Sequence, residues 1–103
     1  MIWPDYYAHL HGIGGLGIST ITKLATFWNQ RFAGHEAVVL DRRILRLLAS
    51  GRWVELGHLR HLTYPLAHHH YVDYLATMAD IADAGDASVK QLEFFLFALG
   101  ESF

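Results

Sequence analysis

A chain of 103 residues fits one domain with one modest core, and a composition that is 52% hydrophobic and 14% aromatic excludes a disordered protein. The absence of cysteine excludes disulfides, thiolate metal ligands and a cysteine nucleophile. The net charge of −2 is unevenly spread: residues 1–62 carry seven basic and four acidic side chains, a net +3, whereas residues 63–103 carry one and six, a net −5. This asymmetry indicates either a basic end that attracts a polyanion or unpatterned surface charge.

Neither a targeting segment nor a membrane span is visible. Residues 1–5 lack the basic and apolar regions of a signal peptide. The longest apolar run, residues 94–99, is about a third of the roughly 20 residues that a span needs. We therefore expect a cytoplasmic protein with no membrane partner.

Helical signals open the chain. Pro4 favours a first helical turn, so we expect a short helix over residues 4–11. Four glycines within residues 12–17 break a helix and predict an irregular hairpin. A second helix is expected over residues 18–31, with an apolar stripe at Ile21, Leu24, Phe27 and Trp28.

The rest of the chain also reads as helical. Asp41 is a good N-cap for a helix that stops at residues 50–51, and residues 52–61 predict a shorter helix around Trp53, Leu56 and Leu59. Pro65 begins a long helix to about residue 84, and Ser88 and Gln91 have capping-box spacing for a last helix. We see no strand alternation and no repeat. These elements predict an all-α, compact bundle of five or six helices in one domain, residues 1–103.

The glycine hairpin has a specific physical use. Such a turn leaves the first amides of the following helix unpaired, and those amides together with the helix dipole favour an anion. A DNA phosphate held there needs no base contact. This use requires the peptide nitrogens near Gly15 and Gly17 to be free. The alternative is a tight connection without a ligand.

The order of segments carries more information than the glycines alone. Residues 15–24, GLGISTITKL, precede residues 37–48, AVVLDRRILRLL. This arrangement resembles the helix-hairpin-helix DNA glycosylase superfamily, and most of all its bacterial 8-oxoguanine DNA glycosylase-like (OGG-fold) group. There a Gly-x-Gly hairpin, a helix, an apolar run ending in Asp and a further helix follow one another. The resemblance covers most of the chain, and its specific part is residues 15–48.

The resemblance implies a glycosylase chemistry. Asp41 matches the aspartate that stabilises the cationic sugar or positions water, and Asp41 as a mere N-cap is the alternative. Ser19 stands where bifunctional members carry a nucleophilic lysine, which implies no Schiff base and no strand cleavage. Lys23 lies one turn beyond Ser19. Its side chain either reaches the pocket in which the nucleophilic lysine of bifunctional members acts or, as we favour, contacts a phosphate. The catalytic candidates are Asp41, Lys23 and Ser19.

The implied partner is double-stranded DNA in the nucleoid, and no cofactor is implied. The nucleic-acid-binding candidates are Gly12, Gly14, Gly15, Gly17, Ser19, Thr20, Lys23, Arg42 and Arg43. The hairpin comes about a dozen residues into the chain, whereas the group has helices before it, so half of the expected base pocket is missing. Either a partner supplies that half, or the chain is truncated, or it no longer cuts. Three functions follow: a monofunctional DNA glycosylase, a DNA-binding module without chemistry, or a protein-interaction domain.

Histidines and aromatics add secondary expectations. Three consecutive helical histidines, residues 68–70, point about 100° apart and cannot share one ion, and we expect no metal site. His9 and His11 flank the hairpin and are placed to meet a phosphate. Candidates for base contact precede the hairpin, and aromatics of the last helix are candidates for burial against a protein partner or a second copy. The candidates for base contact are Trp3, Tyr6 and Tyr7. The aromatics of the last helix are Phe94, Phe95 and Phe97.

Overall fold

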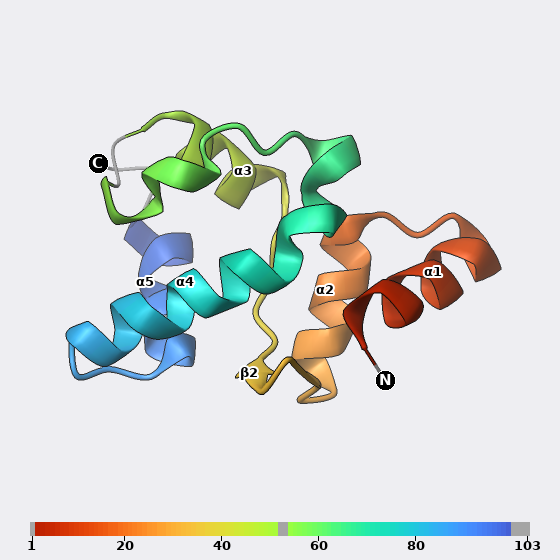
Figure 1. The fold of residues 1–103 in the computed structure, drawn as a ribbon, viewed down its shortest axis with the longest axis horizontal. Coiled ribbons are helices and arrows are strands. Elements are labelled where there is room, and N and C mark those ends of the chain that lie inside the picture. The colour runs from red at the N-terminus through yellow and green to blue at the C-terminus, as the bar shows by residue number, and fades with distance from the viewer. Residues whose placement is uncertain (1, 52–53, 100–103) are drawn as a thin grey trace.

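The computed structural model describes residues 2–51 and 54–99 (Figure 1). These residues form five α-helices and a two-stranded sheet, which confirms the predicted all-α class. The α-helices are α1 (Trp3–Gly14), α2 (Ile18–Phe27), α3 (Arg42–Ala49), α4 (Tyr71–Ala84) and α5 (Val89–Leu99). Shorter elements are the 3-10 helices η1 (Val54–Leu59) and η2 (Tyr64–His70) and the strands β1 (Arg31–Phe32) and β2 (His35–Glu36). Figure 1 shows α1 and α2 at one end and α4 and α5 towards the other.

Helix α1 runs further than predicted. It continues through Gly12 and Gly14, so the prediction that these glycines are irregular is wrong. Glycine costs a helix only about 1 kcal/mol relative to alanine, and the buried Trp3 anchors the helix to the core. The break comes at Gly15, whose φ of 66° is the left-handed conformation that commonly ends helices at glycine.

Helix α2 is shorter than predicted, and a two-stranded sheet that no strand alternation announced follows it. The helix ends at Phe27, and the chain then forms a small antiparallel hairpin in which Arg31 pairs with Glu36. Ala33 and Gly34 connect the strands with φ of 52° and 81°, the positive pair that a tight hairpin turn requires. Phe27, the last residue of α2, is 78% exposed and Trp28 after it is 55% exposed, so neither joins the predicted apolar stripe.

The core surrounds an extended segment, residues 37–40, which is buried throughout. It follows β2 and leads to Asp41 at the start of α3. A buried extended strand without a sheet partner needs other hydrogen-bonding groups for its backbone. Here those groups come from side chains of α2, α4 and α5, as described below.

The second half departs from prediction in helix type. Residues 54–59 form the 3-10 helix η1, and Trp53, which was predicted to centre a helix there, lies outside the described residues. Pro65 begins a helix as predicted, but that helix is the 3-10 helix η2, and α4 begins only after His70. The capping box before α5 is confirmed, because Ser88 and Gln91 each accept a hydrogen bond from the other's amide, at 3.1 and 2.8 Å.

The phenylalanines of α5 do not form a continuous exposed face. Phe94 is 74% exposed, whereas Phe95 and Phe97 are partly buried and pack against the core. Burial of α5 against a protein partner or a second copy therefore stays a prediction that rests on Phe94.

Candidate nucleic-acid interface and aspartate site

Three residues, 15–17, connect α1 to α2. The side chain of His11 braces this connection, because its Nδ1 donates to the Leu16 carbonyl oxygen at 2.8 Å. The Gly15 amide donates to the His11 carbonyl at 2.8 Å, so the prediction of a free nitrogen at Gly15 is wrong. The amides of Gly12 and Gly14 lie inside α1, where helical pairing uses them.

The free nitrogens belong to the next residues. Gly17 is the N-cap of α2 and supplies no side-chain cap. Among the described residues, no hydrogen-bond acceptor is found for the amides of Gly17, Ile18, Ser19 and Thr20. Thr20 is exposed and Ser19 is half-buried. Four unpaired donors at the positive end of a helix dipole are an anion-binding arrangement.

A tyrosine that sequence reasoning missed covers one side of this helix start. The Tyr64 hydroxyl lies so close to Gly17 that a Cβ atom there would overlap it, which explains the glycine. The Arg42 guanidinium lies over the face of the Tyr64 ring, and its central carbon is 3.9 Å from the ring centre. Arg42, Arg46 and Tyr64 also line a shallow cavity of about 310 Å³. The fold thus brings a cation from the start of α3 to the hairpin.

The remaining basic candidates are distributed differently. Arg43 lies over the Phe97 ring at 5.8 Å and donates to the Phe97 carbonyl at 3.3 Å, so it is held on α5. Lys23 is exposed on α2. The structure therefore groups Arg42 with Gly17 but does not bring Arg43 to them.

Asp41 caps α3 as predicted. Its Oδ1 accepts a hydrogen bond from the Ile44 amide at 3.0 Å. The side chain is half-buried, and Oδ2 has no hydrogen-bond partner among the described residues. One oxygen thus fixes the carboxylate at the start of α3, and the other makes no such bond.

Asp41 is connected to α2 through Thr22, a second residue that sequence reasoning missed. Thr22 is fully buried in α2, where its hydroxyl donates to the Ile18 carbonyl at 2.8 Å. The same oxygen accepts from the Leu40 amide at 3.0 Å. The residue before Asp41 is therefore fastened to the first turn of α2, which fixes the aspartate relative to the free amides.

Side chains of α4 and α5 hold the rest of the buried segment. The Tyr71 hydroxyl donates to the Val38 carbonyl at 2.6 Å, and the Tyr74 hydroxyl donates to the Val39 carbonyl at 3.2 Å. Burial raises the pKa of both tyrosines well above the usual value, so they stay neutral donors. Glu93 accepts from the Val39 amide at 2.6 Å, and burial raises the pKa of this carboxyl as well.

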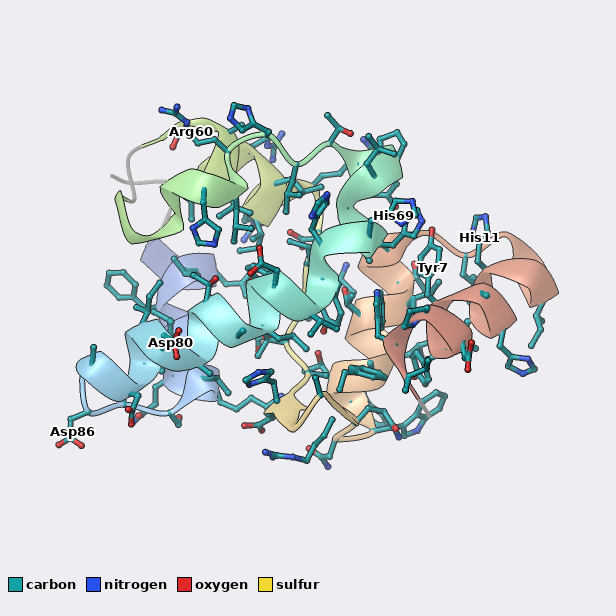
Figure 2. All side chains as sticks on the ribbon, in the orientation of Figure 1. Tyr7, His11, Arg60, His69, Asp80 and Asp86 are labelled. Atoms are coloured by element: carbon teal, nitrogen blue, oxygen red, sulfur yellow. The ribbon has the colours of Figure 1, made fainter. Side chains whose placement is uncertain are left out.

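A larger cavity of about 650 Å³ lies beside the hairpin, between α1 and η2. Its floor is fixed by Trp3, whose Nε1 donates to the His68 carbonyl at 2.6 Å. Trp3 is only 4% exposed and packs on Tyr71, with ring centres 4.2 Å apart, so most of its ring belongs to the core, and contact of Trp3 with a base stays a prediction. Tyr7 and His11 line the cavity, and Figure 2 shows both on one side of α1 with His69 nearby.

Neither cavity is lined by Asp41, Ser19 or Lys23. In the part of the chain that the structure describes, no group of three or more His, Asp or Glu side chains is arranged to hold a metal ion. Within the same residues, every helix is too short or too polar to cross a membrane.

One of the comparisons with known proteins finds a family. Residues 3–97 match the model of the family described as "Putative 8-oxoguanine DNA glycosylase OGG-like protein". No curated protein and no solved structure matches the chain. The match covers α1, the glycine hairpin, Asp41 and most of α5. The chain therefore belongs to the OGG-like family of 8-oxoguanine DNA glycosylase-related proteins.

Proposed function

We propose that this chain grips the backbone of double-stranded DNA at the start of α2 and removes a damaged or modified base with Asp41 as its electrostatic catalyst. The observation that carries the proposal is the link from the Thr22 hydroxyl to the Leu40 amide, because it joins the anion-binding helix start to the aspartate. Membership of the OGG-like family supports DNA as the substrate class.

The backbone grip uses donors that the protein leaves unpaired. A phosphate oxygen at Gly17 accepts hydrogen bonds from amides of the first turn of α2, and the helix dipole adds attraction. Arg42, stacked on Tyr64, supplies a positive charge on the same side. Such contacts position the DNA without reading its sequence.

The chemistry that Asp41 supports is hydrolysis of a glycosidic bond. The bond between C1′ and the base nitrogen breaks, its electron pair leaves with the base, and the sugar becomes an oxocarbenium-like cation. Asp41 Oδ2 stabilises that cation. A water oxygen then bonds to C1′, one of its protons is lost to solvent, and the departing base takes up a proton. Ser19 provides no amine for a Schiff base, so the DNA strand stays intact.

A specific observation favours a second candidate, a DNA-binding module without chemistry. Neither cavity beside the hairpin includes Asp41, and a base must reach the aspartate to be removed. In this alternative Asp41 only caps α3. Binding would still fall steeply with rising salt concentration, because phosphate contacts dominate it.

The two candidates are separated by one substitution. We expect the wild-type protein to create alkali-labile sites in duplexes carrying 8-oxoguanine or another damaged base, and Asp41→Asn to lower this rate about a hundredfold or more. The asparagine oxygen still accepts from the Ile44 amide, so the helix cap and DNA binding are retained. Alkali cleavage after single-turnover incubation measures the rate, and a binding titration measures the affinity.

Asp80→Asn is the matched control, because Asp80 is an exposed carboxylate at the far end of α4 (Figure 2). It should leave the rate unchanged. Equal rates for Asp41→Asn and wild type would contradict the catalytic role of Asp41. DNA binding by the wild type without product from any damaged duplex would reject the enzyme and leave the binding module.

A further inference from the structure

Helix α1 is held to the rest of the chain by few buried groups. Trp3 is its only buried residue, and the others are half-buried or exposed. Two close contacts join this helix to η2, and both involve His68. The Trp3 Nε1 donates to the His68 carbonyl oxygen at 2.6 Å, and the Tyr7 ring lies on the His68 ring, with centres 4.2 Å apart and planes within 3° of parallel. A segment with so little buried surface opens at a low free energy, so the docking of α1 is sensitive to the state of His68.

The position of the His68 ring favours its neutral form. Its Nδ1 atom is buried, and no hydrogen-bond partner for this atom is present among the described residues. A neutral ring with its hydrogen on Nε2 leaves only an acceptor unpaired at Nδ1. A protonated ring carries a hydrogen on both nitrogens, and a buried charged donor without an acceptor is costly. Tyr7, on the face of the ring, supplies no negative charge, because burial raises the pKa of its phenol.

The other titratable groups near the ring also oppose its protonation. His11 approaches from α1 and His69 from η2, with the His69 ring centre at 4.0 Å. Helix α4 contributes Val72 to the adjacent cavity, and none of the described residues that line this cavity is acidic. Burial first, and then the nearby His69 and His11, lower the pKa of His68, whereas the Pro65 carbonyl raises it with the weakest effect of the four.

We propose that His68 is a pH-sensitive latch that holds α1 on η2 while its ring is neutral and weakens this docking when its ring takes up a proton. The connection at residues 15–17 loosens with α1, because His11 on the same helix binds the Leu16 carbonyl. A histidine in an unfolded segment has a pKa near 6.5, and the docked ring binds a proton less tightly. Docking is therefore fully favoured above pH 6.5 and is progressively lost as the pH falls below it, by at most about tenfold in the docking equilibrium for each pH unit.

The test follows hydrogen exchange of the Trp3 indole N–H in the free wild-type chain at about pH 7 and about pH 5, corrected for the intrinsic effect of pH on exchange. The bond to the His68 carbonyl protects this hydrogen. Protection should fall roughly 3- to 30-fold at the lower pH, because uptake of one proton is linked to the opening. The Leu75 amide in the buried part of α4 should not lose protection in parallel, which distinguishes opening of α1 from global unfolding.

His68→Phe keeps a flat ring on Tyr7 and the backbone carbonyl for Trp3, but it cannot take up a proton. The protection of Trp3 should then be equal at the two pH values. His70→Ala is the matched control, because it removes an exposed histidine of η2 whose side chain makes no cap and does not line the cavity. This variant should keep the wild-type loss of protection.

The histidine NMR signals of the wild-type chain test the latch without any variant. His68 should titrate below pH 6.5, together with a change in the Trp3 indole signal. Titration of His68 at or above pH 6.5, or protection of Trp3 that is constant or rises on acidification, would overturn the latch, because attraction between an imidazolium and the Tyr7 ring would then offset burial. A loss of protection that persists in His68→Phe would also overturn it, because another group would then carry the pH dependence.

Discussion

Asp41 reaches its position at the end of a buried segment whose backbone groups are held by single side chains. Thr22 accepts from the Leu40 amide, Tyr74 donates to the Val39 carbonyl, and Glu93 accepts from the Val39 amide. An unpaired buried peptide group costs about 1–3 kcal/mol, so each of these residues has a structural role that its exposure alone does not reveal. Together they fix where the carboxylate lies relative to α2.

Glu93 provides a test at this scale. Because burial raises the pKa of Glu93, the folded chain binds a proton more tightly than the unfolded chain, and stability falls as pH rises above the usual carboxyl value of 4.5. Glu93→Gln keeps an oxygen for the Val39 amide and removes the charge. We expect urea unfolding to show a free energy of unfolding at neutral pH that is no lower than wild type, and a loss of this part of the pH dependence.

Glu93→Ala is the comparison, since it leaves the Val39 amide unpaired and should lower the free energy of unfolding by about 1–3 kcal/mol. If Glu93→Gln destabilised the protein as much as Glu93→Ala, the charge rather than the acceptor would hold the segment.

At the scale of elements, local signals predicted the starts of helices better than their ends. The Asp41 cap and the Ser88 capping box depend on residues three apart, so the sequence alone shows them. The continuation of α1 through two glycines and the hairpin after α2 depend on packing and on backbone angles at Ala33 and Gly34. Periodicity carries no information on either.

The candidate site likewise combines residues that local sequence motifs reveal with residues that only the fold brings together. Gly17 and Asp41 were visible as local motifs and from the family resemblance. Tyr64 was not, because it lies 47 positions after Gly17 and meets it only in the fold. The stack of Tyr7 on His68 is likewise a contact between segments distant in sequence. No local pattern predicts such pairs.

The extent of α1 is itself testable. Gly12 lies within the helix, and a Cβ atom there meets nothing within 4 Å, so Gly12→Ala should raise the free energy of unfolding by about 0.5–1 kcal/mol. Gly15 also has open space but a φ of 66°, so Gly15→Ala should lower it by about 1–2 kcal/mol. Chemical denaturation of the two variants measures both effects. Destabilisation by Gly12→Ala would instead indicate an irregular backbone at residue 12.

At the scale of the whole molecule, two exposed carboxylates of the second half lie far from the glycine hairpin. Figure 2 shows Asp80 on α4 and Asp86 just after α4 towards one end, and Tyr7 and His11 on α1 at the other. The long axis of the molecule is 37 Å, whereas salt screens charges beyond about 8 Å at physiological ionic strength. These carboxylates therefore do not repel DNA that is bound at the hairpin.

The backbone grip at α2 is tested most directly by following every amide nitrogen–proton signal while a DNA duplex is added to the full chain. We predict that the amides of Gly17, Ile18, Ser19 and Thr20 shift most, because they lack acceptors, and that the Gly15 amide, already bonded to the His11 carbonyl, shifts little. Binding with the largest shifts elsewhere, such as around Phe94 on α5, would contradict a backbone grip at the start of α2.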